Sequence, residues 1–86
     1  MLIPREQVME FAEQMELKLL ANDHKQNWRT LTDGQILNLL RAELQELETA
    51  LKHETDDAVI QECADIANCA MFIADKRAKW GRVARR

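Results

Sequence analysis

Residues that break helices are scarce in this sequence, which has two glycines and one proline among 86 residues. Glycine costs about 1 kcal/mol and proline about 3 kcal/mol inside a helix, so long helices are unobstructed here. Tyrosine is absent, aromatic residues make up 5% of the chain, and β-branched residues are few, which argues against strands. Leucine, alanine, glutamate, glutamine, lysine and methionine dominate instead, and all of them favour helices. The composition therefore predicts an all-α protein.

Cysteine is also rare, and long apolar runs are missing. Cys63 and Cys69 are six residues apart, which is roughly 9 Å along a helix and too far for a disulfide bond between them. No apolar stretch approaches the length of about 18 residues that a membrane-spanning helix needs, and the first residues do not resemble a signal peptide. We therefore expect a cytoplasmic protein in a reducing environment, without a membrane partner.

The apolar content exceeds what so short a chain can bury by itself. Residues 1–86 form one small domain, and a domain of this size has a thin core. Apolar residues nonetheless make up 47% of the chain against 31% charged residues, the balance of a folded protein. A partner chain is a reasonable place to bury the surplus.

Positive charge is concentrated at the C-terminal end. The net charge is −3, but residues 1–75 hold fifteen acidic and six basic residues, whereas residues 76–86 hold no acidic residue. This basic tail consists of Lys76, Arg77, Lys79, Arg82, Arg85 and Arg86. An acidic body with a basic tail suits either nucleic acid or phosphates held near a metal site.

Three helices account for most of the chain, and we expect them at about residues 4–21, 33–53 and 56–80. Pro4 suits the first helical turn. The first helix has an apolar stripe at spacings of three and four residues, which we expect to be buried; it consists of Val8, Phe11, Met15 and Leu19. Residues 22–32 lack this periodicity, so we expect a loop there.

Capping residues mark the ends of the second and third helices. Thr32 and Gln35 have the spacing of a capping box, in which each side chain bonds the backbone of the other residue. Thr55 is a good N-cap, and two aspartates follow it in the first turn, where acidic side chains favour the helix dipole. Gly81 can end the third helix.

Two pairs of carboxylates stand at i and i+3, Glu43 with Glu46 and Glu62 with Asp65. Residues three apart share one helix face. At 100° per residue, both pairs project into the half of their helix that should be buried. The opposite, solvent-facing side of the third helix should carry polar residues, which are Asp57, Gln61, Asn68 and Asp75.

Four buried carboxylates need compensation. Burying even one unpaired carboxylate costs several kcal/mol, and few basic residues lie on the inward faces. Hard divalent cations take oxygen ligands from aspartate and glutamate, so the two pairs predict one metal site between the helices. The alternative is a plain helical hairpin whose acidic residues lie at its rim and pair with the basic tail.

The same residues carry a resemblance to a known family. Glu43-x-x-Glu46, fifteen intervening residues and Glu62-x-x-Asp65 resemble the E-x-x-E…E-x-x-D signature of the MazG-like all-α nucleoside triphosphate pyrophosphohydrolases. The stretch from Glu62 to Asp75 is similar to the third helix of short members that phages and mobile elements carry. The match covers roughly residues 25–76, including Lys25-x-x-Trp28.

The resemblance implies hydrolysis of a nucleoside triphosphate to the monophosphate and pyrophosphate. It implies Mg²⁺, with Mn²⁺ as a substitute, held by Glu43, Glu46, Glu62 and Asp65, and an assembly of two or four chains. We expect Glu43 or Glu46 to act as the base that orients water, with Glu62 and Asp65 as the firmest metal ligands. The chain has no clear fourth helix after Gly81, so a neighbouring subunit would complete the pocket.

Four further residues are candidates for substrate binding, each with a plainer alternative. Lys76 either contacts a phosphate or is a solvated cation at a helix end. Asn68 matches a recurrent polar position of the family, although its helical phase points to solvent. Trp28 either stacks on a nucleobase or covers the end of the core, and Lys25 is a weaker candidate for a phosphate. The two histidines have no ligand partner at zinc spacing.

A second broad face of the third helix is lined by small residues, namely Cys63, Ala64, Ala67, Ala70 and Ala74. Three helices cannot cover this face as well, so we expect a homodimer or homotetramer formed through it. Two other functions compete with the enzyme. One is a non-catalytic helical dimer that binds nucleic acid or a protein through the basic tail, and the other is a purely structural module. Neither shows a recognition motif, so we rank the enzyme first.

Overall fold

The computed structural model describes residues 2–23, 27–53 and 55–78, and these residues form an all-α fold, as predicted. The elements are α1 (Glu6–Ala21), the short 3₁₀-helix η1 (Trp28–Thr30), α2 (Asp33–His53) and α3 (Asp56–Arg77). The predicted bounds of the second helix are confirmed. Helix α1 begins two residues later than predicted. Helix α3 ends at Arg77 because Ala78 is extended (φ −77°, ψ 154°), so its predicted continuation to residue 80 is wrong. Gly81, the predicted stop, lies outside the described residues.

Side-chain hydrogen bonds cap the N-terminal ends of both helices of the hairpin, α2 and α3. The backbone N–H of Thr32 donates to Gln35 Oε1 at 2.8 Å, and the N–H of Gln35 donates back to Thr32 Oγ1 at 3.1 Å. The hydroxyl of Thr55 accepts from the N–H of Ala58 at 3.3 Å. The predicted capping box and N-cap are thus confirmed, and each is typically worth about 1 kcal/mol.

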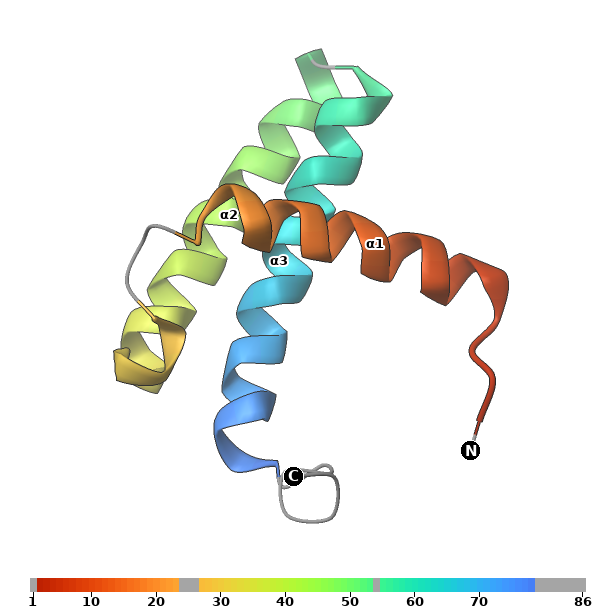
Figure 1. Ribbon diagram of the computed structural model, residues 1–86. Coiled ribbons are helices and arrows are strands. Elements are labelled where there is room, and N and C mark those ends of the chain that lie inside the picture. Colours follow the sequence, from red (N-terminus) through yellow and green to blue (C-terminus); the bar gives the residue numbers. More distant parts are fainter. Residues whose placement is uncertain (1, 24–26, 54, 79–86) are drawn as a thin grey trace.

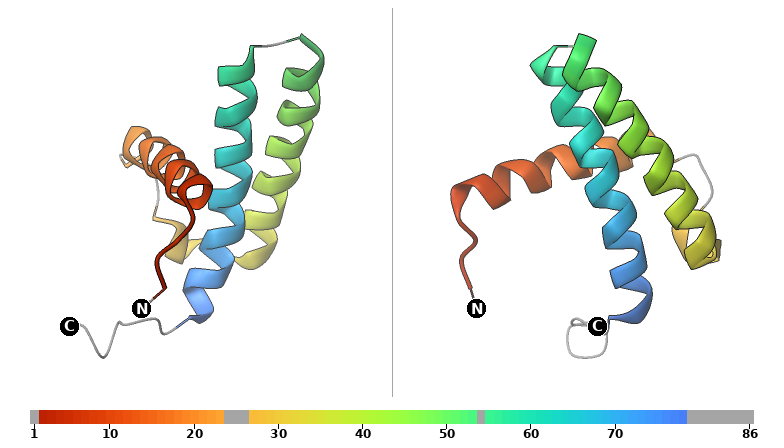
Figure 2. Two further views of the ribbon diagram at one scale, coloured as in Figure 1. Left: turned by 90° about the vertical axis from the view of Figure 1, so that its right-hand side faces the viewer. Right: turned by 180° about the vertical axis from the view of Figure 1, so that it is seen from behind.

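Helices α2 and α3 lie side by side as an antiparallel hairpin, and α1 crosses one face of it (Figure 1). Figure 2 shows α1 from its end, lying against the hairpin as a second layer. Helix α3 is the central element, since it contacts α2, α1 and η1. The face of α3 that points away from α2 is therefore covered within the chain itself.

The described residues include few buried apolar side chains, as expected for a chain of this length. The buried apolar residues are Ile36, Ala50, Ala64 and Cys69. No residue of α1 is buried, and Val8, expected in its buried stripe, is 52% exposed. The N-terminal part of α1, to which Val8 belongs by its position in the sequence, extends beyond the hairpin (Figure 1).

Large apolar side chains remain exposed on α1 and α2, including Leu17, Leu20, Leu44 and Leu51. On α3, Ala64 is fully buried within the chain, whereas Ala70 and Ala74 are exposed. The small-residue face predicted for assembly is thereby reduced to its C-terminal part. Assembly into a dimer or tetramer stays a prediction. No helix in the described parts of the chain is long and apolar enough to cross a membrane.

The segment predicted as a loop contains η1, which packs on the C-terminal half of α3. Asn27 caps it by accepting the N–H of Arg29 at 2.8 Å. The ring of Trp28 stacks on Phe72 with centroids 4.7 Å apart and planes at 11°. Trp28 Nε1 donates to Asp75 Oδ2 at 3.2 Å, and the Arg29 guanidinium donates to the same oxygen at 2.6 Å.

These contacts correct two predictions about α3. Asp75 is 8% exposed and Asn68 is 4% exposed, although both were expected on the solvent face. Helical phase identified the side of α3 opposite α2, but it could not show that α1 and η1 cover that side. Asp57 and Gln61, nearer the start of α3, are exposed as expected.

Candidate metal centre and adjoining cavity

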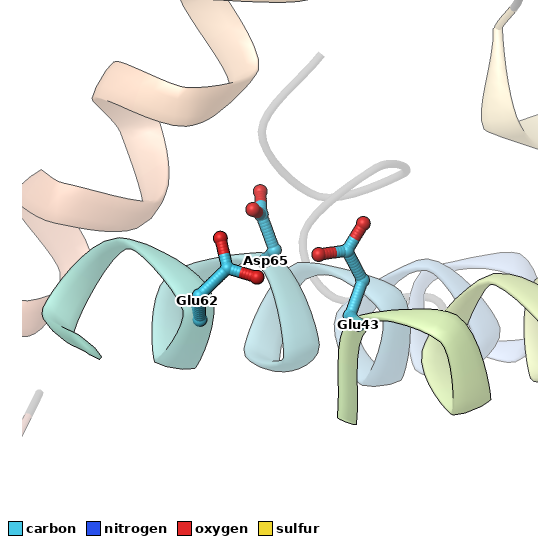
Figure 3. Close-up of side chains that lie close together, drawn as sticks. All are labelled: Glu43, Glu62 and Asp65. Carbon is cyan, nitrogen blue, oxygen red and sulfur yellow. The ribbon is translucent and has the colours of Figure 1, made fainter. Parts of the chain in front are cut away.

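Three carboxylates from two helices converge at the middle of the hairpin. Glu43 comes from α2, and Glu62 and Asp65 come from the facing turns of α3. One carboxylate oxygen of each lies within 4.8 Å of the other two. Figure 3 shows the three side chains rising from the same side of the two helices toward a common point. The i, i+3 spacing on α3 and the antiparallel pairing of the helices produce this convergence.

Two of the three carboxylates have no protein partner for a buried oxygen. Oε2 of Glu43 and Oε2 of Glu62 are both buried and accept no hydrogen bond from the described residues. Burial raises the pKa of Glu43 to about 7, aided by the hydrogen bond that its neutral form would share with Glu46 and by the nearby charges of Asp65, Glu46 and Glu62. Burial and the Glu46 carboxyl likewise raise the pKa of Glu62. The cluster thus concentrates negative charge that the protein leaves largely uncompensated.

Glu46 stands at the edge of this cluster. It is exposed and is not one of the three residues that converge within 4.8 Å. Its carboxyl group nevertheless contributes to the raised pKa values of both Glu43 and Glu62. The structure therefore gathers three of the four predicted carboxylates tightly and places the fourth at their exposed side.

Lys18 of α1 contributes a cation that the sequence analysis missed. Its Nζ lies 3.2 Å from Asp65 Oδ2. A signal was available, because Lys18 follows Met15 by three residues and Phe11 by seven, and so shares the face of their apolar stripe. The apolar stripe predicts that this face is buried, and a lysine within it is then expected to meet an acidic partner on the facing helix.

A cavity of about 520 Å³ adjoins the carboxylates. Glu43, Asp65 and Lys18 line one part of it, and Trp28 and Phe72 are among the residues that line the rest. Cys69 also lines it, and burial, followed by the charges of Glu43 and Asp65, raises the pKa of its thiol to about 11. A volume of this order is typical of small-molecule sites, which fall at roughly 300–1,000 Å³.

Asn68 lies in the wall of this cavity with half of its amide unsatisfied. Its Nδ2 donates to the main-chain oxygen of Met15 in α1 at 3.1 Å. Its Oδ1 is buried and has no hydrogen-bond partner in the described chain. The Met15 oxygen only accepts hydrogen bonds, so it fixes which end of the amide faces α1 and leaves Oδ1 for a donor from elsewhere.

The other predicted substrate-binding residues have different positions. Trp28 stacks on Phe72 and also lines the cavity, so both of its predicted roles stay predictions. Lys76 is engaged at the far end of the hairpin, where its Nζ donates to the Leu31 oxygen at 2.6 Å and to Asp33 Oδ1 at 3.1 Å. Lys25 lies outside the described residues, as do residues 79–86 of the basic tail.

Comparison with known proteins agrees with this geometry. The family model for phosphoribosyl-ATP pyrophosphohydrolase matches residues 8–77, a span that holds the four carboxylates and the residues that line the cavity. No curated protein or solved structure was found to match the chain. Members of the matched family are pyrophosphohydrolases that act on nucleotides and generally use a divalent metal. The chain therefore belongs to the phosphoribosyl-ATP pyrophosphohydrolase family, within the MazG-like all-α nucleoside triphosphate pyrophosphohydrolases.

Proposed function

We propose that this protein hydrolyses a nucleoside triphosphate between its α and β phosphates, with Mg²⁺ held by Glu43, Glu62 and Asp65. One observation carries the proposal. The three carboxylates converge within 4.8 Å of one another at the edge of a cavity of about 520 Å³. The site thus combines ligands for a hard cation with adjoining space for an organic molecule.

The carboxylates fit a divalent cation by their chemistry. The buried Oε2 atoms of Glu43 and Glu62 have no donor in the described chain, and Lys18 alone would leave most of the negative charge unbalanced. Mg²⁺ and Mn²⁺ prefer carboxylate oxygens. Bound there, such a cation supplies Lewis acidity toward a phosphoryl oxygen and lowers the repulsion between the carboxylates and a triphosphate.

Glu46 is the carboxylate that we assign as general base. It is the exposed member of the four and lies outside the convergent three, so its oxygens are the ones left to face an incoming water. Glu46 would orient that water and accept its proton as the phosphoanhydride bond breaks and pyrophosphate leaves. Glu43 remains the alternative base if it does not hold the metal.

The cavity would hold the nucleoside. Trp28 and Phe72 supply aromatic surface, and Asn68 Oδ1 offers a buried acceptor to an N–H or O–H group of the nucleotide. Filling that acceptor relieves an unsatisfied polar group, which typically costs about 1–3 kcal/mol. Lys25 and Lys76 stay predictions as phosphate ligands, and Lys76 would have to leave Asp33 to serve as one.

The test is release of pyrophosphate from a panel of ribo- and deoxyribonucleoside triphosphates and from phosphoribosyl-ATP, with and without Mg²⁺. We expect turnover only with metal, and a loss of at least about a hundredfold in Glu62→Gln and in Asp65→Asn, because each variant removes a charge that holds the cation. Glu48→Gln is the matched control, since Glu48 is an exposed glutamate of the same α2. The proposal fails if no nucleotide of the panel is cleaved, or if both site variants retain full activity.

A further inference from the structure

Lys18 stands between the carboxylate cluster and the cavity. Its Nζ lies 3.2 Å from Asp65 Oδ2, and the two side chains are 27% and 18% exposed. Burial and Glu46 raise the pKa of Glu62, and the charge of Lys18 opposes that rise, so its field reaches a second carboxylate. Lys18 also lines the cavity beside Glu43 and Asp65. An ammonium group therefore occupies the boundary between the two parts of the site.

The backbone that carries Lys18 is fixed on both sides. Three residues earlier, the Met15 oxygen accepts from Asn68 of α3. The Lys18 oxygen itself accepts from Asn22 Nδ2 at 2.9 Å, at the C-terminal end of α1. The Cα of Lys18 is thus held beside the cavity. The four methylene groups of the side chain are flexible, so Nζ can change partners.

The charges at this boundary indicate when Nζ would change partners. Lys18 pairs with Asp65, one of the three carboxylates that converge on the candidate cation site, and a divalent cation carries twice the charge of the ammonium. A cation on Asp65 would compete with Lys18 for the same carboxylate. An ammonium group displaced in this way would face the cavity. A polyphosphate bound there would be the most highly charged anion that the ammonium could contact.

We propose that Lys18 is a phosphate-binding residue, which Asp65 holds beside the cavity until a divalent cation replaces it on that carboxylate. This inference rests on the proposed function, because it requires a polyphosphate at the mouth of the cavity. According to this inference, Lys18 binds a phosphate of the substrate and competes with the metal for Asp65. Its role is thus more than packing of α1 against α3.

The first experiment measures Mn²⁺ binding to the full chain without nucleotide, by electron paramagnetic resonance. Lys18→Gln should bind Mn²⁺ at least about threefold more tightly, because a competing positive charge a few ångströms away is gone. Lys52→Gln is the matched control, since Lys52 is an exposed lysine in the last turn of α2, and it should bind as the wild type does. Unchanged or weaker Mn²⁺ binding in Lys18→Gln would overturn the competition. A loosened α1 cannot imitate the expected gain in affinity.

The second experiment measures binding of inorganic tripolyphosphate in the presence of Mg²⁺ by calorimetry. We expect Lys18→Gln to bind about tenfold more weakly, Lys18→Arg to recover most of that loss, and Lys52→Gln to be unaffected. Tripolyphosphate needs no base pocket and no turnover. A wild type that binds it but cleaves no nucleotide would therefore overturn the proposed function and leave Lys18 as a phosphate ligand. Equal binding by the wild type and Lys18→Gln, or no binding by either, would overturn the inference.

Discussion

Nδ2 of Asn68 in α3 donates to the main-chain oxygen of Met15 in α1 at 3.1 Å, and this bond joins the outer helix to the helix that carries two of the carboxylates. The same side chain holds a buried, unpartnered Oδ1 in the wall of the cavity. One amide therefore bonds α1 through its nitrogen and has an oxygen to which no described residue donates. The two ends of the amide can be followed by different measurements, since unfolding reports on the bond to α1 and nucleotide kinetics report on the acceptor.

We expect Asn68→Leu to change the free energy of unfolding by about 1 kcal/mol or less, because it removes one hydrogen bond and one unsatisfied acceptor together. The KM for the best nucleotide should nevertheless rise about tenfold, since the ligand loses that acceptor. Urea unfolding and steady-state kinetics measure the two effects. Asn38→Leu, at an exposed position on α2, is the control. An unchanged KM would remove Asn68 from the nucleotide site.

Asp75 should be among the most sensitive positions for stability. The residue is 8% exposed, and its carboxylate accepts hydrogen bonds from Trp28 Nε1 and from the Arg29 guanidinium. Replacing Asp75 by alanine removes the acceptor of both the half-buried Trp28 indole and the Arg29 guanidinium, so we expect a loss of about 2 kcal/mol or more. Asp57→Ala, at an exposed position in the first turn of α3, should cost less than half as much. Equal losses in the two variants, measured by chemical denaturation, would contradict the role of Asp75 in anchoring η1.

The carboxylate cluster should make the metal-free protein less stable as the pH rises. The folded-state pKa of Glu43 is about 7, above its ordinary value of 4.5. The stability from binding this proton is therefore complete below about pH 4.5 and is lost as the pH rises through 7. With a chelator present, we expect a lower Tm at pH 7.5 than at pH 5.5, and Glu43→Gln should flatten this slope. Mg²⁺ should raise the Tm most at the higher pH, because protons then compete least for the carboxylates. The same slope in Glu43→Gln and the wild type would assign it to other groups.

Asp33 should give the opposite dependence on pH. Hydrogen bonds from Arg77 and then Lys76 lower its pKa to about 2, and they join the start of α2 to the end of α3. The stability from this contact is present above the ordinary pKa of 3.8 and is lost as the pH falls through 2. Asp33→Asn should therefore have a lower Tm than the wild type at pH 6, and the difference should shrink toward pH 2. A difference that does not depend on pH would show that the ion pairs contribute nothing to stability.

The chain should sediment as a dimer or tetramer at micromolar concentration. Its own core is small, leucines on α1 and α2 are exposed, and Ala70 and Ala74 of α3 are exposed as well. A charge within a small-residue contact is strongly unfavourable, so Ala70→Glu should shift the protein toward monomer. Gln45→Glu adds the same charge at an exposed position of α2 and should leave the assembly intact. A wild type that sediments as a stable monomer would contradict the prediction.

The sequence by itself determined the features that depend on local chemistry. The bounds of the second helix, the caps at Thr32 and Thr55 and the convergence of three of the four predicted carboxylates, Glu43, Glu62 and Asp65, follow from spacing along one or two helices. Local hydrogen bonds and helical periodicity operate within a few residues, and the sequence displays them directly. The family resemblance that the motif carried was confirmed as well.

Only the tertiary structure decided what covers the far side of α3. Asn68 and Asp75 are polar and were assigned to solvent, but α1 and η1 lie over them and bury both. The pairing of Lys18 with Asp65 joins residues that are 47 positions apart in sequence, so helical periodicity does not reveal it. Periodicity shows which residues share a face, but not which element will pack against that face. Contacts between distant segments depend on the whole packing of the chain, and so does the cavity beside the carboxylates.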